Sequence, residues 1–309
     1  MPDTRHVPIL VEPIVTALIE PFRGISESEP AHWLVDCTLG GGGHTAAFLD
    51  AFARDPKLAR HKIAAFDQDP AAISRAKTHF EKEIAEGRLE IHHARFSGAA
   101  EFLKEKSVLG LMADLGFSSD QVDEANRGLS FMADAPLDMR MDPTHGISCR
   151  EYLFHVSEDE LERVLREYGE ERFSRRISST LIQARRENRL PTTTKGLSTM
   201  IVHAIPSGAR HGRIHAATRS FQALRIAVND ELKELDSLLR HVIIEVRPRG
   251  RVAILSFHSL EDREVKHAFK DSPLWHPLTK KPVEAPESEL SRNPRSRSAK
   301  LRIAERTRE

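Results

Sequence analysis

The stretch WLVDCTLGGGGHTAAFLDAF, residues 33–52, joins a short apolar run ending in Asp36 to four consecutive glycines and then to a segment with helical spacing. This order predicts a β-strand, a tight loop and an α-helix. Each glycine held in ordered structure costs roughly 0.5–1 kcal/mol relative to alanine, so Gly40–Gly43 cost on the order of 2–4 kcal/mol. A loop of this cost indicates a backbone that must come close to another group.

Short apolar runs continue to alternate with helical patterns downstream. The runs that predict further strands are Lys62–Asp69, Arg88–Phe96, Val108–Gly116, PRGRVAILSFHS at 248–259 and KLRIAER at 300–306. Strands separated by helices along the chain predict a parallel sheet with helices on its faces. We therefore expect an α/β fold.

This alternation stops in the middle of the chain. The segment after Gly116 is rich in Asp, Gly, Ser and Met and is typical of a loop, and the pattern after Ile147 is helical. The strand–helix alternation resumes near Phe221. The sequence therefore predicts an α/β domain formed by residues 1–141 and 221–309, interrupted by an all-helical insert at residues 142–220.

Composition indicates a cytoplasmic protein. The only two cysteines, Cys37 and Cys149, fit no metal or redox spacing, which favours a reducing compartment. No window approaches eighteen apolar residues, and the first residues lack the pattern of a secretory signal. We expect no membrane span and no metal site.

Charge is unevenly distributed, although 46 basic and 46 acidic residues give a formal net charge of zero. Residues 172–225 contain 11 Lys and Arg residues and a single acid, Glu187. A polyanion responds to such a local patch and not to the net charge. Charge alone leaves two interpretations open, a nucleic-acid surface and ordinary solvated helix faces.

Two nucleotide-binding motifs fit the glycine loop poorly. A phosphate-binding Walker loop requires Gly-Lys-Ser/Thr, whereas His44 and Thr45 follow the glycines here. A dinucleotide fingerprint starting at Gly41 ends in Ala46, a permitted variant, so an NAD-dependent dehydrogenase remains open.

The spacing Asp36-x-Thr-x-Gly40-x-Gly42 also fits the S-adenosylmethionine loop of class I methyltransferases. Glycines there let the backbone approach the amino-acid part of the cofactor. Asp67 ends the second predicted strand, 24 residues after Gly43, where an acid can accept hydrogen bonds from both ribose hydroxyls. Together the two acids favour the methyl donor.

Longer motifs extend over nearly the whole chain. They are HVPIL, DCTLGGGGH, FDQDPAAI, ADLGFSSDQVDEANRGLSFMADAPLDMRMDP, YGEERFSRRI, ATRSFQALRIAVNDEL, LSFHSLEDREVK, NPRSRS and LRIAER. Through them the chain resembles the bacterial S-adenosylmethionine-dependent methyltransferases that modify N4 of a cytidine in the decoding centre of 16S ribosomal RNA. The resemblance implies a class I, Rossmann-like sheet with a helical insert, and this activity. Gly41 and Ala216 are small departures from the family pattern.

The resemblance also implies the cofactor contacts. Carried over to this sequence, they are Gly42, Gly43, His44, Asp67, Phe96, Asp114 and Gln121. Phe96 follows the third predicted strand, where a flat ring can stack on adenine, although the position also suits a core phenylalanine. An acid at Asp114, at the carboxyl edge of the sheet, can lie near the sulfonium.

Two residues are candidates for the group that accepts a proton from the cytosine amine. The Asp/Asn-Pro-Pro-aromatic turn of amino-directed DNA methyltransferases is absent, and Asp114-Leu-Gly-Phe-Ser-Ser takes its place. Asp114, or a backbone carbonyl in that turn, is the first candidate. His258, after the fifth predicted strand, is the second, with a purely structural role as the alternative.

RNA recognition is assigned to the insert. The assigned arginines are Arg172, Arg175, Arg176, Arg185, Arg186, Arg189, Arg210, Arg213 and Arg219. The target base must be single-stranded or flipped to react, and the loop Gly128–Asp142 is expected to cover it. The sequence leaves open whether naked 16S rRNA or the small ribosomal subunit is the substrate, and which oligomer forms. Two rival functions are a small-molecule methyltransferase and a non-catalytic S-adenosylmethionine-binding RNA protein.

Overall fold

The computed structural model describes residues 8–307, apart from 119–120, 122–123, 211 and 213. The chain forms two compact units. The first unit combines Met1–Ser118 with Leu232–Glu309, and the second is Ser119–Glu231. The predicted insert, 142–220, falls within the second unit, which extends beyond it on both sides.

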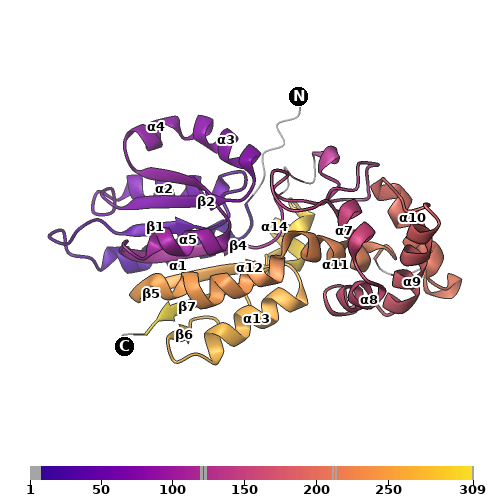
Figure 1. Cartoon of the computed structure of the whole chain (residues 1–309). Helices are drawn as coiled ribbons and strands as arrows, with labels where there is room; N and C mark the ends of the chain where they lie inside the picture. The colour runs from indigo at the N-terminus through magenta and orange to yellow at the C-terminus, as the bar shows by residue number, and fades with distance from the viewer. Residues whose placement is uncertain (1–7, 119–120, 122–123, 211, 213, 308–309) are drawn as a thin grey trace. The chain divides into compact units, whose positions relative to one another are not determined.

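The first unit is built on a seven-stranded sheet with the order β3-β2-β1-β4-β5-β7-β6 (Figure 1). The strands are β1 (Trp33–Asp36), β2 (Lys62–Asp67), β3 (Leu89–His93), β4 (Val108–Asp114), β5 (Val246–Ser256), β6 (Trp275–Pro277) and β7 (Lys300–Arg306). The first five are parallel, whereas β7 runs antiparallel to both β5 and β6. The sheet confirms the predicted Rossmann-like α/β class. Strand β6 lies in a region whose sequence is typical of a loop.

Alternate residues of the central strands enter two separate cores. Leu34 and Ile63 belong to one hydrophobic cluster, and their neighbours Val35 and Ala64 belong to another. This alternation places the clusters on opposite faces of the sheet. Because both faces are buried, β1 reads as a continuous apolar run before Asp36.

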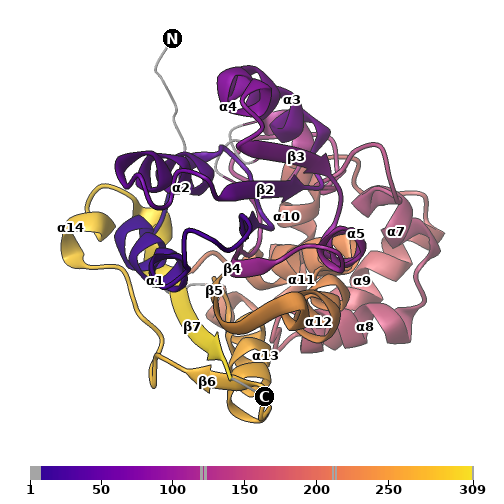
Figure 2. The same cartoon turned by 90° about the vertical axis from the view of Figure 1, so that its left-hand side faces the viewer.

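Helices cover both faces, as Figure 2 shows with α1 and α2 on one side and α5 on the other. The α-helices of the first unit are α1 (Val11–Arg23), α2 (Gly43–Arg54), α3 (Pro70–His79), α4 (Glu81–Ala85), α5 (Phe96–Leu103), α12 (Glu231–Ser237), α13 (Ser259–Lys270) and α14 (Glu287–Leu290). The unit also contains a short π-helix, η3 (Leu238–Val242), and two 3-10 helices, η4 (Ile243–Glu245) and η5 (Pro294–Ser298). Helix α12 begins at the border of the two units. Within the described ranges, no helix has the length and apolarity needed to cross a membrane.

The second unit is helical and has its own hydrophobic core. Its helices are α7 (Cys149–His155), α8 (Glu158–Glu167), α9 (Ser174–Arg186), α10 (Thr194–Ala204) and α11 (Thr218–Asn229), with the turns η1 (Ala125–Arg127) and η2 (Ser207–Ala209). Apolar residues of all five helices pack into one cluster, which also includes Leu137 and Met139 of the preceding loop. The loop therefore folds with the helices, which explains why the unit begins before residue 142.

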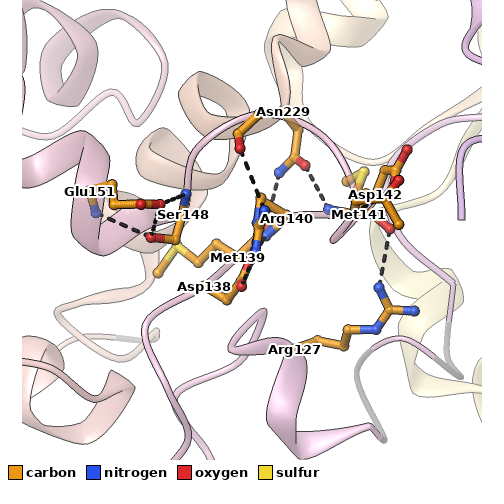
Figure 3. Close-up of polar contacts among 11 residues, drawn as sticks. Arg127, Asp138, Met139, Arg140, Met141, Asp142, Ser148, Glu151 and Asn229 are labelled. Atoms are coloured by element: carbon orange, nitrogen blue, oxygen red, sulfur yellow. Dashed lines mark hydrogen bonds and ion pairs between the residues drawn. The ribbon is translucent and has the colours of Figure 1, made fainter.

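A buried amide fixes that loop, as Figure 3 shows. Asn229, at the end of α11, donates to the Met139 carbonyl at 2.8 Å and accepts from the Met141 amide at 2.7 Å. Met139 has a left-handed backbone with φ of 63°, which is costly for a residue with a side chain. Because Asn229 bonds the peptide groups on either side of Arg140, it fixes the chain directly after Met139 and ties the loop to the last helix of the unit.

Candidate functional site

Three carboxyl groups end three adjacent parallel strands at one edge of the sheet. Asp36 of β1 is in register with Ala65 of β2 and Met112 of β4, so Asp67 and Asp114 lie two residues further along their strands. Strand order reverses at β1 and β4, and ligands of open α/β sheets bind outside the carboxyl ends of strands at such a point. The sequence prediction that Asp67 and Asp114 share this edge is confirmed by the register.

Asp36 organises the loop that leaves β1. Its side chain is fully buried and accepts hydrogen bonds from the Thr38 amide at 3.0 Å and the Thr45 hydroxyl at 2.7 Å. The Thr38 hydroxyl in turn accepts from the Asp114 amide at 2.6 Å. Asp36 therefore fixes the start of the glycine loop, the first turn of α2 and, through Thr38, the end of β4.

Thr38 and Thr45 are structural members of the site; the sequence analysis included Thr38 only in the spacing of the glycine loop and gave Thr45 no structural role. Their signal is the spacing of two hydroxyl residues at two and nine positions after Asp36. An aspartate side chain that accepts from the backbone amide two positions later, as Asp36 does from Thr38, is typical of an Asx turn.

The glycine run is required in part by the protein's own packing. Gly40 and Gly42 have left-handed backbones with φ of 50° and 79°. A Cβ atom at Gly42 would lie 2.7 Å from the Phe80 ring, which is itself buried. A Cβ atom at Gly43 would lie 2.8 Å from the Pro8 ring. Close approach by Phe80 and Pro8 therefore accounts for two glycines that sequence analysis explains by a ligand alone.

Gly42→Ala is expected to lower the free energy of unfolding by roughly 2–4 kcal/mol, because it adds a clash with Phe80 to the cost of a left-handed backbone. Gly87→Ala is the matched control, since Gly87 has φ of 69° but no described atom within 4 Å of its added Cβ. We expect a loss of about 1–2 kcal/mol for the control. Urea unfolding of both variants measures the difference, and equal losses would show that the Phe80 ring gives way without cost.

Asp67 links the glycine loop to the end of β2. Its Oδ2 accepts from the Gly40 amide at 2.7 Å and its Oδ1 accepts from the Asp69 amide at 2.8 Å. Burial raises the pKa of Asp67 to about 6. Each carboxylate oxygen can accept a second hydrogen bond, so Asp67 retains acceptor capacity for a pair of hydroxyl groups.

Asp114 presents an acceptor without a partner. Its Oδ1 is buried and makes no hydrogen bond with any described residue. Burial, followed by the nearby carboxylates of Asp36 and Glu261, raises the pKa of Asp114 to about 8. A buried polar atom left unpaired is costly in a folded protein and commonly marks a functional position.

His258 is held by Glu261 at the start of α13. The imidazole Nδ1 accepts from the Glu261 amide at 3.4 Å, and Nε2 lies 3.1 Å from Glu261 Oε1. Glu261 Oε2 accepts from the His258 amide at 3.4 Å, which completes a capping box, and also from the Phe257 amide at 2.9 Å. Nε2 nevertheless makes no hydrogen bond with any described residue, so the geometry leaves both interpretations of His258 open, a structural role and proton acceptance.

The remaining predicted cofactor residues differ in their surroundings. The His44 side chain is buried, and its Nε2 lies 2.9 Å from the Ile9 carbonyl oxygen. Burial lowers the pKa of His44, so the ring is neutral near pH 7 and donates to that oxygen. Phe96 begins α5, is half-buried and packs against the core on its face of the sheet. Gln121 is buried and belongs to the second unit.

The structure separates the insert arginines into two groups. Arg185 donates to the carbonyls of Leu153, Phe154 and Val156, so it closes the end of α7. Three others also bind locally: Arg210 to the His203 and Ile205 carbonyls, Arg219 to the Glu170 carbonyl, and Arg189 to Glu187.

The second group of arginines is exposed on or beside α9. It comprises Arg172, Arg175, Arg176 and Arg186. No acidic side chain in the described part of the chain pairs with any of these four, and Arg172 lies over the Phe173 ring. Arg213 lies outside the described residues. The exposed group, which we call the α9 arginines, is free to contact a polyanion.

Comparison with known proteins matches the chain to a family of methylases. A family model described as the MraW methylase family matches residues 3–307. The chain is 43% identical over 302 residues to a Synechococcus elongatus protein named ribosomal RNA small subunit methyltransferase H, covering 98% of this chain and 95% of that protein. Proteins of the same name from Nostoc punctiforme and Geobacter are 45% and 41% identical, covering 93% and 99% of this chain and 91% and 100% of theirs. Among solved structures, an rRNA methylase from Streptococcus thermophilus matches with a TM-score of 0.39 and 10% identity, covering 95% of this chain and 92% of that one.

Proposed function

Because the chain belongs to the MraW methylase family, we propose that it transfers a methyl group from S-adenosylmethionine to N4 of a cytidine in the decoding centre of 16S ribosomal RNA. At the coarser level, it is a methyltransferase of small-subunit ribosomal RNA, like the relatives that carry that name. The single observation that carries the proposal is the carboxyl edge of β1, β2 and β4, where Asp67 keeps acceptor capacity and Asp114 has a buried oxygen without a partner.

The residues at this edge fit S-adenosylmethionine. The first-turn amides of α2 have no partner within the helix and favour a carboxylate such as that of the cofactor's amino-acid part. Asp67 would accept from the ribose hydroxyls, and Phe96 would lie against the adenine. When bound, S-adenosylmethionine supplies a methyl group on a positively charged sulfur.

Asp114 is the proposed proton acceptor. The cytosine amine is a weak nucleophile because its lone pair is delocalised into the ring, so a group must orient its N–H bonds and take up the proton. Asp114 Oδ1 and His258 Nε2 are both buried without a hydrogen bond in the described structure, and we place Asp114 first because it ends β4 beside the point where strand order reverses. A cationic sulfur nearby would lower the pKa of Asp114 from about 8, which favours the ionised carboxylate during the reaction.

We propose that the insert, residues 142–220, binds the RNA while residues 1–141 and 221–309 carry out methyl transfer. The α9 arginines support this division, because they are exposed and unpaired with acids in the described structure. Phosphate contacts by such arginines supply affinity, and the target cytosine must leave its stack to react. The proposed place of action is the cytoplasm.

RNA affinity is expected to fall with salt, with a slope of log K against log salt of about −3 to −4 if roughly five arginines contact phosphates. Replacing Arg175, Arg176 and Arg186 together with Gln should reduce the slope to about −1 to −2, because each lost phosphate contact removes about 0.7–0.9. Fluorescence anisotropy at several salt concentrations measures this. Arg23→Gln, at an exposed position of α1, is the control. An unchanged slope in the triple variant would contradict the assignment.

Labelled methyl donor provides the test of the function itself. The enzyme is incubated with small ribosomal subunits or naked 16S rRNA from cells that lack the modification, and the nucleosides are then separated. Label in N4-methylcytidine is expected. Label in another nucleoside would overturn the acceptor, and no transfer to either RNA, with donor bound, would favour a non-catalytic binding protein. Comparing subunits with naked RNA identifies the substrate form.

A further inference from the structure

A short segment near the start of the described chain lies against the glycine loop. Pro8 fills the space beside Gly43, with its Cγ 2.8 Å from the position of an added Cβ. The next residue, Ile9, is buried and accepts the hydrogen bond of His44 at 2.9 Å. We call Pro8–Leu10 the brace. It contacts the first two residues of α2, whose amides belong to the proposed cofactor site.

The brace is also fixed from the C-terminal part of the chain. The Leu10 amide donates to Glu289 Oε1 of α14 at 3.0 Å, across 279 positions of sequence. Leu10 is buried and has a left-handed backbone with φ of 52°, an uncommon conformation for leucine. Such a conformation persists only where surrounding contacts enforce it. His44 on one side and Glu289 on the other supply those contacts.

We propose that the brace holds the glycine loop in its cofactor-binding shape, and that His44 and Glu289 are positioning residues that act through it. The His44 side chain is turned to Ile9, so its effect on the cofactor passes through the brace. This inference rests on the proposed function for the identity of the ligand. It also gives a role to the last three residues of the HVPIL motif, which the proposed reaction does not use.

Two explanations for the glycine at position 43, packing against Pro8 and close approach of a ligand, make different predictions. If Gly43 is glycine because a ligand approaches it, an added methyl group harms binding whatever residue stands at position 8. If it is glycine because Pro8 packs there, removing the proline ring relieves the harm. Gly43 does not have a left-handed backbone, so an alanine at this position adds no backbone strain that would obscure the comparison.

A double-mutant cycle of Gly43→Ala and Pro8→Gly separates these cases. Titration calorimetry with S-adenosylmethionine measures Kd, and urea unfolding measures stability. We expect Gly43→Ala to weaken Kd roughly 10-fold in the parent chain. The same change should weaken it less than about 2-fold in the Pro8→Gly background. Equal losses in both backgrounds would overturn the brace.

Conservative variants test the two positioning residues independently, even if Gly43→Ala does not fold. His44→Gln keeps an N–H donor for the Ile9 carbonyl, and Glu289→Gln keeps an acceptor for the Leu10 amide. Both should retain Kd within about 2-fold, whereas His44→Leu and Glu289→Ala should weaken it roughly 5- to 10-fold. The KM for the RNA should stay unchanged in all four. If His44→Gln loses as much as His44→Leu, the imidazole itself contacts the cofactor and the proposal is wrong.

Failure of the proposed function gives a different result from failure of the brace. If the parent chain does not bind S-adenosylmethionine, the donor assignment fails. Urea unfolding of the four proteins in the cycle still tests the brace, because the coupling free energy between positions 8 and 43 in stability does not depend on the ligand. Additive losses of stability would then overturn the packing on which the brace depends.

Discussion

Asp114→Asn is expected to lower the single-turnover rate of methyl transfer about 10²- to 10⁴-fold, the range supplied by a positioned proton acceptor. The amide keeps the shape of the side chain but cannot take up the proton of the cytosine amine. Rapid-quench measurement with saturating donor and RNA isolates this step. His258→Ala is the comparison and should lose far less. Near-parental rates in both variants would show that neither side chain is the acceptor.

The same substitution should stabilise the fold as the pH rises. The pKa of Asp114 is about 8 in the folded chain and 3.8 in the reference state. Between these values the folded chain holds a proton that the unfolded chain releases, so the wild-type chain loses stability from pH 4 toward pH 8. Asn carries no charge and removes this loss. Urea unfolding should therefore show a gain for Asp114→Asn that is small at pH 5 and reaches a few kcal/mol at pH 8.

The pH profile of the reaction supplies the control for this assignment. The rate should rise with pH as Asp114 ionises, with a midpoint at or below about 8 because a nearby cation lowers its pKa. The Asp36 carboxylate contributes to the raised pKa, and Asp36→Asn keeps groups able to bond Thr38 and Thr45. That variant should shift the midpoint to lower pH. A midpoint that does not move would argue against Asp114 as the titrating group.

Asp67→Asn is expected to weaken the affinity for S-adenosylmethionine about 100-fold or more. Both carboxylate oxygens accept a backbone amide, from Gly40 and Asp69, so an Asn side chain must point its NH₂ group at one of these donors. The variant therefore distorts the glycine loop and also loses charge-assisted bonds to the ribose hydroxyls, each about 1.5–3 kcal/mol. Titration calorimetry measures Kd.

Asp69→Asn is the matched control for this prediction. Asp69 caps α3 by accepting from the Ala71 amide at 2.9 Å, and Asn is an equally good capping residue. The control should bind the cofactor within a few-fold of the parent chain. Affinity of the parent chain should also fall below about pH 6, as Asp67 becomes protonated. Equal losses in Asp67→Asn and Asp69→Asn would contradict the prediction, because the loss would then not be specific to the Asp67 carboxylate.

Local patterns in the sequence determined the sheet and the positions of its acids. Strands buried on both faces must be continuous apolar runs, so the strands that end in Asp36, Asp67 and Asp114 are visible without any tertiary information. Parallel direction follows from the alternation with helices, and it brings these carboxyl groups to one edge. By contrast, the patterns assign no element to Val11–Arg23, a helix with an internal Pro21.

Tertiary structure alone decided how each site residue is used. The antiparallel direction of β7 and the three-residue strand β6 depend on neighbouring strands, not on local sequence. Partners of the side chains lie far away in the chain: Ile9 is 35 positions from His44, and Glu289 is 279 positions from Leu10.

The glycine run illustrates the division between what the local sequence determines and what the tertiary structure decides. From the sequence, the run indicates only that a Cβ atom is not tolerated at these positions, because glycine is the one residue that lacks a Cβ atom. The fold places Phe80 and Pro8 in that space and Asp67 on the Gly40 amide. Sequence periodicity reports which face of an element is buried, whereas the identity of the atoms that pack against that face depends on how distant segments come together.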